Sequence, residues 1–213
     1  MPKTAVILGA TGLVGGEIVE QLAKRRSIAT VIAITRRAVK FKSPKVANHV
    51  VNFDDLSAAA ELFQGDLFFS ALGTTRKQAG SIKAQRTVDL DYQLQAATLA
   101  AQNGVGHYLL VSSSAADSSS KSAYLKMKGE LEDAVLELPF ARISIFRPSL
   151  LLGNRARFRA GEALGAKILP AICSLPGLRR YRPITGEQVA IKMVEASLNS
   201  GPPRQSYSLN EIF

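Results

Sequence analysis

The sequence predicts an α/β fold: a doubly wound parallel sheet with helices on both faces. Two observations support this prediction. Short apolar runs rich in β-branched residues alternate with helix-like segments along the 213 residues, and a glycine-rich turn joins the first apolar run to a helix. The length suits one domain of ordinary size, so we expect residues 1–213 to form it, with 150–213 as a small irregular region facing the substrate.

The individual elements follow from the position of the apolar runs. We expect strands at Thr4–Leu8, Thr30–Thr35, His49–Asn52, Leu67–Ala71, His107–Ser113, Ala141–Pro148 and Ser206–Leu209. We expect helices at Leu13–Lys24, Leu56–Leu62 and Val88–Asn103, and around Ser122–Glu130. Glycine and proline recur through Leu150–Pro183, which predicts an irregular region. Ligands bind at the carboxyl ends of the strands in such a sheet, so candidate site residues belong there.

Composition narrows the class of protein. Apolar residues make up 46% and charged residues 21% of the chain, and no apolar run approaches the ~18 residues of a membrane span. The N-terminus lacks the layout of a signal peptide. The single cysteine, Cys173, has no internal partner and joins no Cys/His cluster, so we expect no metal and a reducing, cytoplasmic location.

The net charge of +10 is spread along the chain rather than gathered in a nucleic-acid-binding motif. We therefore expect a small-molecule substrate, with no nucleic acid and no membrane as partners; a homodimer is left open. Six arginines follow the sixth strand: Arg155, Arg157, Arg159, Arg179, Arg180 and Arg182. Our hypothesis is that they flank a mobile lid that favours anionic substrates. The alternative is that they form a solvated surface.

The first turn, "GATGLVG", has the context that a dinucleotide-binding motif requires, because it follows a buried strand and opens a helix. Gly9 permits the tight turn, Gly12 lets a pyrophosphate approach, and Gly15 lets the helix pack closely. The unpaired N–H groups of the helix N-terminus then face the phosphate. The cofactor-binding set therefore also includes Thr11, Leu13 and Val14.

The end of the second strand predicts which nicotinamide cofactor is bound. An NAD site places an acidic residue there for the ribose hydroxyls, but this chain reads "ITRRAVK". Arg36 and Arg37 can instead bind the 2′-phosphate of NADP. A solvated turn is the alternative interpretation, but the missing acid is separate evidence for NADP.

Two further strand ends complete the expected cofactor site. After the third strand, Asp54 can accept from an adenine amino group, with Phe53 beside the ring, or it can cap the next helix; the sequence leaves both open. After the fourth strand, Ala71, Leu72 and Gly73 are small or backbone-accessible enough for the cofactor to pass close by.

The stretch "SAYLKMKGE" places Tyr124 and Lys128 four residues apart, on one face of a helix. Ser112, Ser113 and Ser114 end the preceding strand. In carbonyl reduction, Lys128 would bind the nicotinamide ribose and lower the pKa of Tyr124, the proton donor, while a serine orients the substrate oxygen. Ser113 is our first choice and Ser112 our second. Alone, the spacing would indicate only a packing helix; with the glycines, arginines and serines in order, it favours a catalytic centre.

Together these features resemble the short-chain dehydrogenase/reductase superfamily in its atypical, compact branch. Over almost the whole chain, "LGTTRKQAGS", "VDLDYQLQAATLA", "LLVSSS", "AYLKMKGELE" and "FRPSLLLG" resemble segments of the Tat-interacting, oxidoreductase-like proteins and their bacterial relatives. This resemblance implies a Rossmann fold, NADPH binding through the glycines and Arg36/Arg37, and a Tyr124/Lys128 centre.

We therefore expect an NADPH-dependent oxidoreductase acting on a carbonyl or alcohol. The alternative is a non-catalytic NADPH-binding regulator that acts through a protein partner; Tyr124 and Lys128 favour the enzyme, because a sensor needs neither. A nucleotide-sugar epimerase is a weaker third hypothesis, since few residues follow Pro148 to build a sugar-nucleotide lobe.

Overall fold

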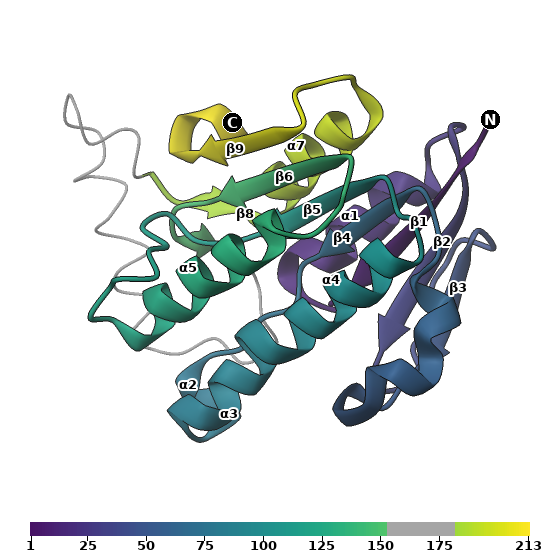
Figure 1. Ribbon diagram of the computed structural model, residues 1–213. Helices are drawn as coiled ribbons and strands as arrows, with labels where there is room; N and C mark the ends of the chain where they lie inside the picture. The colour runs from purple at the N-terminus through teal and green to yellow at the C-terminus, as the bar shows by residue number, and fades with distance from the viewer. Residues whose placement is uncertain (153–181) are drawn as a thin grey trace.

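A parallel sheet of seven strands, in the order β3-β2-β1-β4-β5-β6-β9, forms the centre of the computed structural model, which describes residues 1–152 and 182–213 (Figure 1). The doubly wound fold predicted from the sequence is confirmed. The strands are β1 (Lys3–Leu8), β2 (Ile28–Thr35), β3 (Val46–Val50), β4 (Leu67–Ser70), β5 (His107–Val111), β6 (Arg142–Arg147) and β9 (Arg204–Ser208). A separate two-stranded ladder pairs β7 (Leu151–Leu152) with β8 (Ile184–Thr185).

Helices cover both faces of the sheet, as Figure 1 shows. On one face lie α1 (Leu13–Ala23) and α7 (Gly186–Leu198), whose apolar residues form one buried cluster with that side of the strands. On the other face lie α4 (Tyr92–Gln102) and α5 (Ala123–Leu136), which belong to a second cluster. The shorter elements are η1 (Phe53–Phe63), α2 (Arg76–Ala79), α3 (Ile82–Arg86), the π-helical turn η2 (Thr87–Asp91) and η4 (Leu209–Ile212).

The strand order reverses between β1 and β4, and this reversal fixes where a ligand can bind. The chain runs outward from β1 to β2 and β3, then crosses over to β4 on the other side of β1. Leu8 pairs with Ser70, so β1 and β4 end at the same level of the sheet. In doubly wound sheets the crevice outside such a reversal is the ligand-binding position.

Several predicted elements differ from the structure. The third strand begins at Val46 rather than His49, because Val46 to Val50 pair with Val31 to Thr35 of β2. The segment predicted as a helix at Leu56–Leu62 is a kinked 3₁₀ element. The helix predicted at Val88–Asn103 is preceded by α3 and starts in the π-helical turn, where Asp89 is buried; Gln93, at the start of α4, is buried as well.

Most of the region from Leu150 to Pro183 lies outside the described residues. Cys173 and five of the six arginines assigned to a lid also lie there. The sixth, Arg182, is described: its guanidinium lies 3.6 Å from the ring centroid of Phe213.

Candidate functional site

The turn between β1 and α1 packs directly against the end of β4. Gly9 has φ +87°, and a Cβ there would lie 2.6 Å from the backbone of Ala71 and Leu72. A Cβ on Gly15 would lie 2.1 Å from the carbonyl oxygen of Gly9, so α1 starts in contact with the turn before it. The structure therefore brings together the two predicted backbone segments, Gly9–Gly15 and 71–73.

The first turn of α1 can receive an anion. Gly12 is the N-cap residue; among the described residues no side chain caps the helix, and its first turn carries no acidic residue. Thr11 and Gly12 are exposed, Leu13 is half-buried and Val14 is buried, so the backbone rather than side chains borders the crevice. Uncapped N–H groups and the helix dipole favour a phosphate at this position, which fits a dinucleotide.

The end of β2 presents two exposed arginines, Arg36 and Arg37, and no acidic side chain. Thr35 fixes the turn: its hydroxyl donates to the carbonyl oxygen of Arg37 at 2.8 Å and accepts from the side-chain amide of Asn48 at 2.7 Å. Neither arginine forms an ion pair with the part of the chain that the structure describes. Both guanidinium groups are therefore available for an anion, and bidentate geometry suits a phosphate.

Asp54 contacts a residue that the sequence analysis missed. The hydroxyl of Tyr92, on α4, donates to the carboxylate of Asp54, and this hydrogen bond, with burial second, raises the pKa of Tyr92. Phe53 packs edge-on against the same ring at 5.8 Å. Asn52 caps η1 by accepting from the backbone N–H of Asp54, so Asp54 is not the cap and its carboxylate faces Tyr92.

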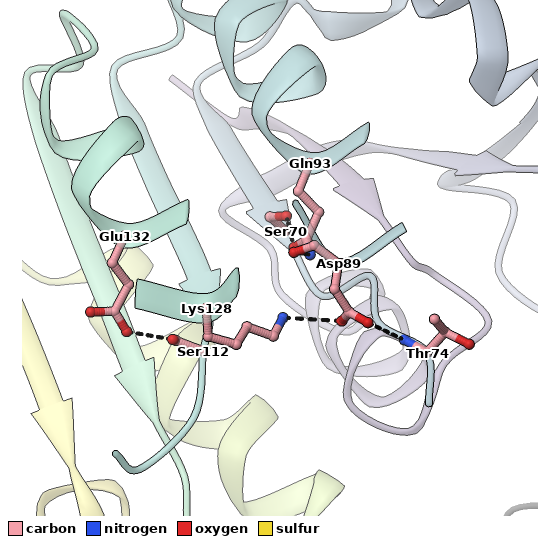
Figure 2. Close-up of polar contacts among 7 residues, drawn as sticks. All are labelled: Ser70, Thr74, Asp89, Gln93, Ser112, Lys128 and Glu132. Atoms are coloured by element: carbon pink, nitrogen blue, oxygen red, sulfur yellow. Dashed lines mark hydrogen bonds and ion pairs between the residues drawn. The ribbon is translucent and has the colours of Figure 1, made fainter. Parts of the chain in front are cut away.

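Helix α5 carries the Tyr124/Lys128 pair. Tyr124 is 38% exposed in the first turn of the helix, whereas Lys128, one turn later, is 3% exposed. Figure 2 shows the Lys128 side chain reaching from α5 toward Asp89 of η2, and the Nζ–Oδ1 distance is 3.4 Å. The accessible phenol of Tyr124 is therefore followed, one turn later, by a buried ammonium group that is paired with a carboxylate.

The serines at the end of β5 have different surroundings. Ser112 is buried, and its hydroxyl donates to Glu132 of α5 (Figure 2). Glu132 also pairs with Arg147 of β6; this hydrogen bond raises the pKa of the Arg147 guanidinium. Ser113 and Ser114 are half-buried. The Ser112 hydroxyl is therefore committed to a buried network, and Ser113 is the next hydroxyl along the chain.

Four site residues were missed: Asp89, Tyr92, Glu132 and Arg147. Each contacts a predicted residue or its partner over a sequence separation of at least 15. None of the four has a local sequence signal, because each contact forms only when elements that are far apart in the chain pack together.

Comparison with known proteins agrees with this geometry. Residues 9–148 match a family described as NAD(P)H-binding. The chain belongs to that family. It is also 41% identical over 174 residues to Protein HTATIP2 of Rattus norvegicus, covering 80% of this chain and 72% of the relative. The NAD(P) binding that the resemblance implied is therefore the part of the expected function that the family match bears out.

A second group of relatives corrects the expected location. Protein FMP52, mitochondrial, of Saccharomyces cerevisiae is 34% identical over 208 residues, covering 92% of this chain and 87% of the relative. The same name is carried by a relative from Candida glabrata, 34% identical over 202 residues, covering 92% and 85%. The cytoplasmic location expected from the sequence is therefore contradicted. One cysteine indicates at most a reducing compartment, and that does not single out the cytoplasm.

Solved structures support the fold. WbmH of Bordetella bronchiseptica, in complex with NAD⁺, superposes with a TM-score of 0.74 at 15% identity, covering 98% of this chain and 75% of that one. A short-chain dehydrogenase/reductase superfamily protein from Agrobacterium tumefaciens with bound NAD gives 0.73 at 13% identity, covering 97% and 77%. At these identities the likeness establishes the Rossmann fold alone.

Two features are absent from the residues that the structure describes. None of the helices there combines the length and the apolar character that crossing a membrane requires. In the same residues, no three His, Cys, Asp or Glu side chains are grouped so as to hold a metal ion.

Proposed function

We propose that the chain is an NADPH-dependent oxidoreductase that transfers a hydride to or from a carbonyl or alcohol, with Tyr124, Lys128 and Ser113 at its centre. The observation that carries this proposal is the burial of Lys128 at the ligand-binding edge of the sheet, one helical turn after an exposed phenol. Burying an ammonium is costly, and a helix that served only for packing would gain nothing from it.

The cofactor side of the proposal rests on two features of the backbone and surface. The uncapped start of α1 and the close approach of Gly9 to Ala71 support binding of the pyrophosphate. Arg36 and Arg37, which have no acidic residue next to them in the sequence, support a 2′-phosphate, and hence NADPH rather than NADH. We assign the adenine end to Asp54 and Tyr92. When bound, NADPH supplies the hydride.

The chain's own residues would then handle the proton. Lys128 would orient the ribose through its ammonium, and its charge would favour proton release from the phenolic oxygen of Tyr124. Tyr124 would pass that proton to the substrate oxygen in reduction, or accept it in oxidation. Ser113 would donate to the same oxygen and fix its position. We prefer Ser113 to Ser112 because the Ser112 hydroxyl already donates to Glu132.

A substrate screen tests the proposal. The protein is mixed with NADPH and a panel of aldehydes, ketones and quinones, and the loss of NADPH absorbance is followed. We expect turnover of at least one carbonyl class, reduced at least ~10²-fold in Lys128→Met, because the residue serves both ribose and proton donor. Lys126→Met is the matched control, since Lys126 is exposed on the same helix; it should keep full activity.

Two results would contradict this function. Equal losses in the two lysine variants would mean that the charge of α5 matters only for stability. NADPH binding without turnover of any carbonyl would favour the alternative, a non-catalytic regulator that reports cofactor to a protein partner.

A further inference from the structure

The segment that follows β4 is basic, and the proposed function uses only its first residues. The stretch from residue 71 to residue 88 contains no acidic residue, whereas Arg76, Lys77, Lys83 and Arg86 are basic. Arg86 pairs with Glu130 of α5. Arg76 and Lys77 are exposed, and neither forms an ion pair with the part of the chain that the structure describes. Their charges therefore leave a positive potential at this place on the surface.

The two unpaired cations border a cavity. Arg76 and Lys77, together with Thr75 and Gly80, line an open space of about 530 Å³. A space of this size is typical of small-molecule sites, but such sites are usually lined mainly by apolar side chains. Here the lining that the structure describes is polar and cationic, so the cavity suits an anionic group better than an apolar one.

Local hydrogen bonds fix the shape of this lining. The hydroxyl of Thr75 caps α2 by accepting from the backbone N–H of Gln78 at 3.3 Å. Gly80 ends α2 with φ +88°, and its N–H donates to the carbonyl oxygen of Arg76 at 2.8 Å. The two cations therefore lie on a turn that is closed at both ends, which reduces the entropy lost when they bind a ligand.

The cavity begins beside the proposed reactive centre. Thr74 directly precedes the lining residues, and its backbone N–H donates to Oδ2 of Asp89 at 3.3 Å (Figure 2). The other carboxylate oxygen of Asp89 lies 3.4 Å from Nζ of Lys128. A substrate whose carbonyl group reaches Tyr124 can therefore extend another of its groups toward the cavity.

We infer that this cavity binds an anionic group of the substrate, so that the protein acts on carbonyl compounds, or the matching alcohols, that carry a carboxylate or a phosphate. Arg76 supplies a planar set of N–H donors and Lys77 a compact positive charge, and both anions accept from such donors. This inference rests on the proposed function, because it names the class of substrate for the same site.

Two aldehydes that differ by one carboxylate test the inference: para-carboxybenzaldehyde and benzaldehyde, each reduced with saturating NADPH. In the unmodified protein, kcat/KM should be about tenfold or more higher for the charged aldehyde, the scale of one hydrogen bond between charged groups. Glycolaldehyde phosphate and glycolaldehyde provide the same comparison for phosphate, and a preference in either pair supports the inference.

The double change Arg76→Gln/Lys77→Gln should remove most of this preference, mainly by raising KM for the charged aldehyde. The matched control is Arg25→Gln/Arg26→Gln, which changes two adjacent exposed cations after the end of α1 and should keep the preference. NADPH affinity is measured on the same samples. If the Arg76/Lys77 variant loses NADPH affinity as strongly as it loses the preference, the two cations bind the cofactor, and the inference is overturned.

Calorimetric binding separates this inference from the proposed function. Para-(hydroxymethyl)benzoate and benzyl alcohol are titrated into the protein saturated with NADP⁺, and the charged compound should bind more tightly. That preference, in a protein that turns over no carbonyl compound, overturns only the proposed function. Reduction of the neutral aldehydes with no preference for a charged compound in either measurement overturns the inference and leaves the proposed function standing. A preference that survives Arg76→Gln/Lys77→Gln also overturns the inference.

Discussion

Replacing Gly15 by alanine should disturb both stability and cofactor binding, while the same change at the next residue should not. A Cβ on Gly15 would lie 2.1 Å from the carbonyl oxygen of Gly9, where ordinary contact begins at 3.4 Å. Both atoms belong to backbone, so α1 or the turn must move by roughly an ångström, which costs about 1–3 kcal/mol as overpacking. That movement also pulls the first turn of α1 away from the position of a bound phosphate.

Gly16→Ala is the matched control. A Cβ there would meet its nearest atom, the carbonyl oxygen of Ala10, at 3.7 Å, which is ordinary contact. Since Gly16 lies inside α1, alanine should stabilise the helix by up to ~1 kcal/mol. Urea unfolding gives the free energy of unfolding of each protein, and fluorescence titration gives its NADPH affinity. If Gly15→Ala matches Gly16→Ala in both, the close packing of α1 on the turn is not what shapes the cofactor site.

Two further predictions concern charge. With Arg36 and Arg37 intact, NADPH should bind at least tenfold more tightly than NADH, about 1.4 kcal/mol. The double change Arg36→Ala/Arg37→Ala should remove most of that preference and leave NADH affinity nearly unchanged. The exposed Lys40 provides the control, because Lys40→Ala should keep the preference for NADPH. Equal affinities for NADPH and NADH in the unmodified protein would contradict the assignment of Arg36 and Arg37 to the 2′-phosphate. Burial, with Arg142 and Lys3 nearby, lowers the pKa of His107 to about 3. The unfolded chain therefore takes up a proton that the folded chain does not, so stability is full above pH ~6.5 and falls by up to ~1.4 kcal/mol per unit as pH drops toward 3. In His107→Gln, the free energy of unfolding measured with urea should depend less on pH between about 6.5 and 3. In the control His49→Gln this pH dependence should not change. The same pH dependence in both variants would refute the role assigned to His107.

Much of the fold could be predicted because its signals are local. The β-branched runs at β1 and β2 and the glycine turn between β1 and α1 each depend on a few adjacent residues. The third strand was placed too late because Val46–Val50 is only half-buried, so its apolar pattern is weak and its start is set by pairing with β2. The break before α4 was missed because a π-helical turn has no simple sequence signature.

The residues of the candidate site also separate into those with a local sequence signal and those without one. Motifs can nominate Gly9, Gly15 and the exposed Arg36, because the conformation and exposure of these residues depend on the local chain. Asp89 and Glu132 could not be assigned that way, since each acts on a side chain that comes close only after the sheet has formed. Such contacts must be read from packing.

The measurement that tests the account most directly is a pair made on one sample of Tyr124→Phe: NADPH affinity and single-turnover hydride transfer. The substitution removes one oxygen from an exposed side chain, so stability and NADPH affinity should barely change. Hydride transfer should fall by a factor on the order of 10² or more, the usual scale for a lost general acid. Unchanged affinity with unchanged hydride transfer would contradict the account, because Tyr124 would then be only part of a helix surface.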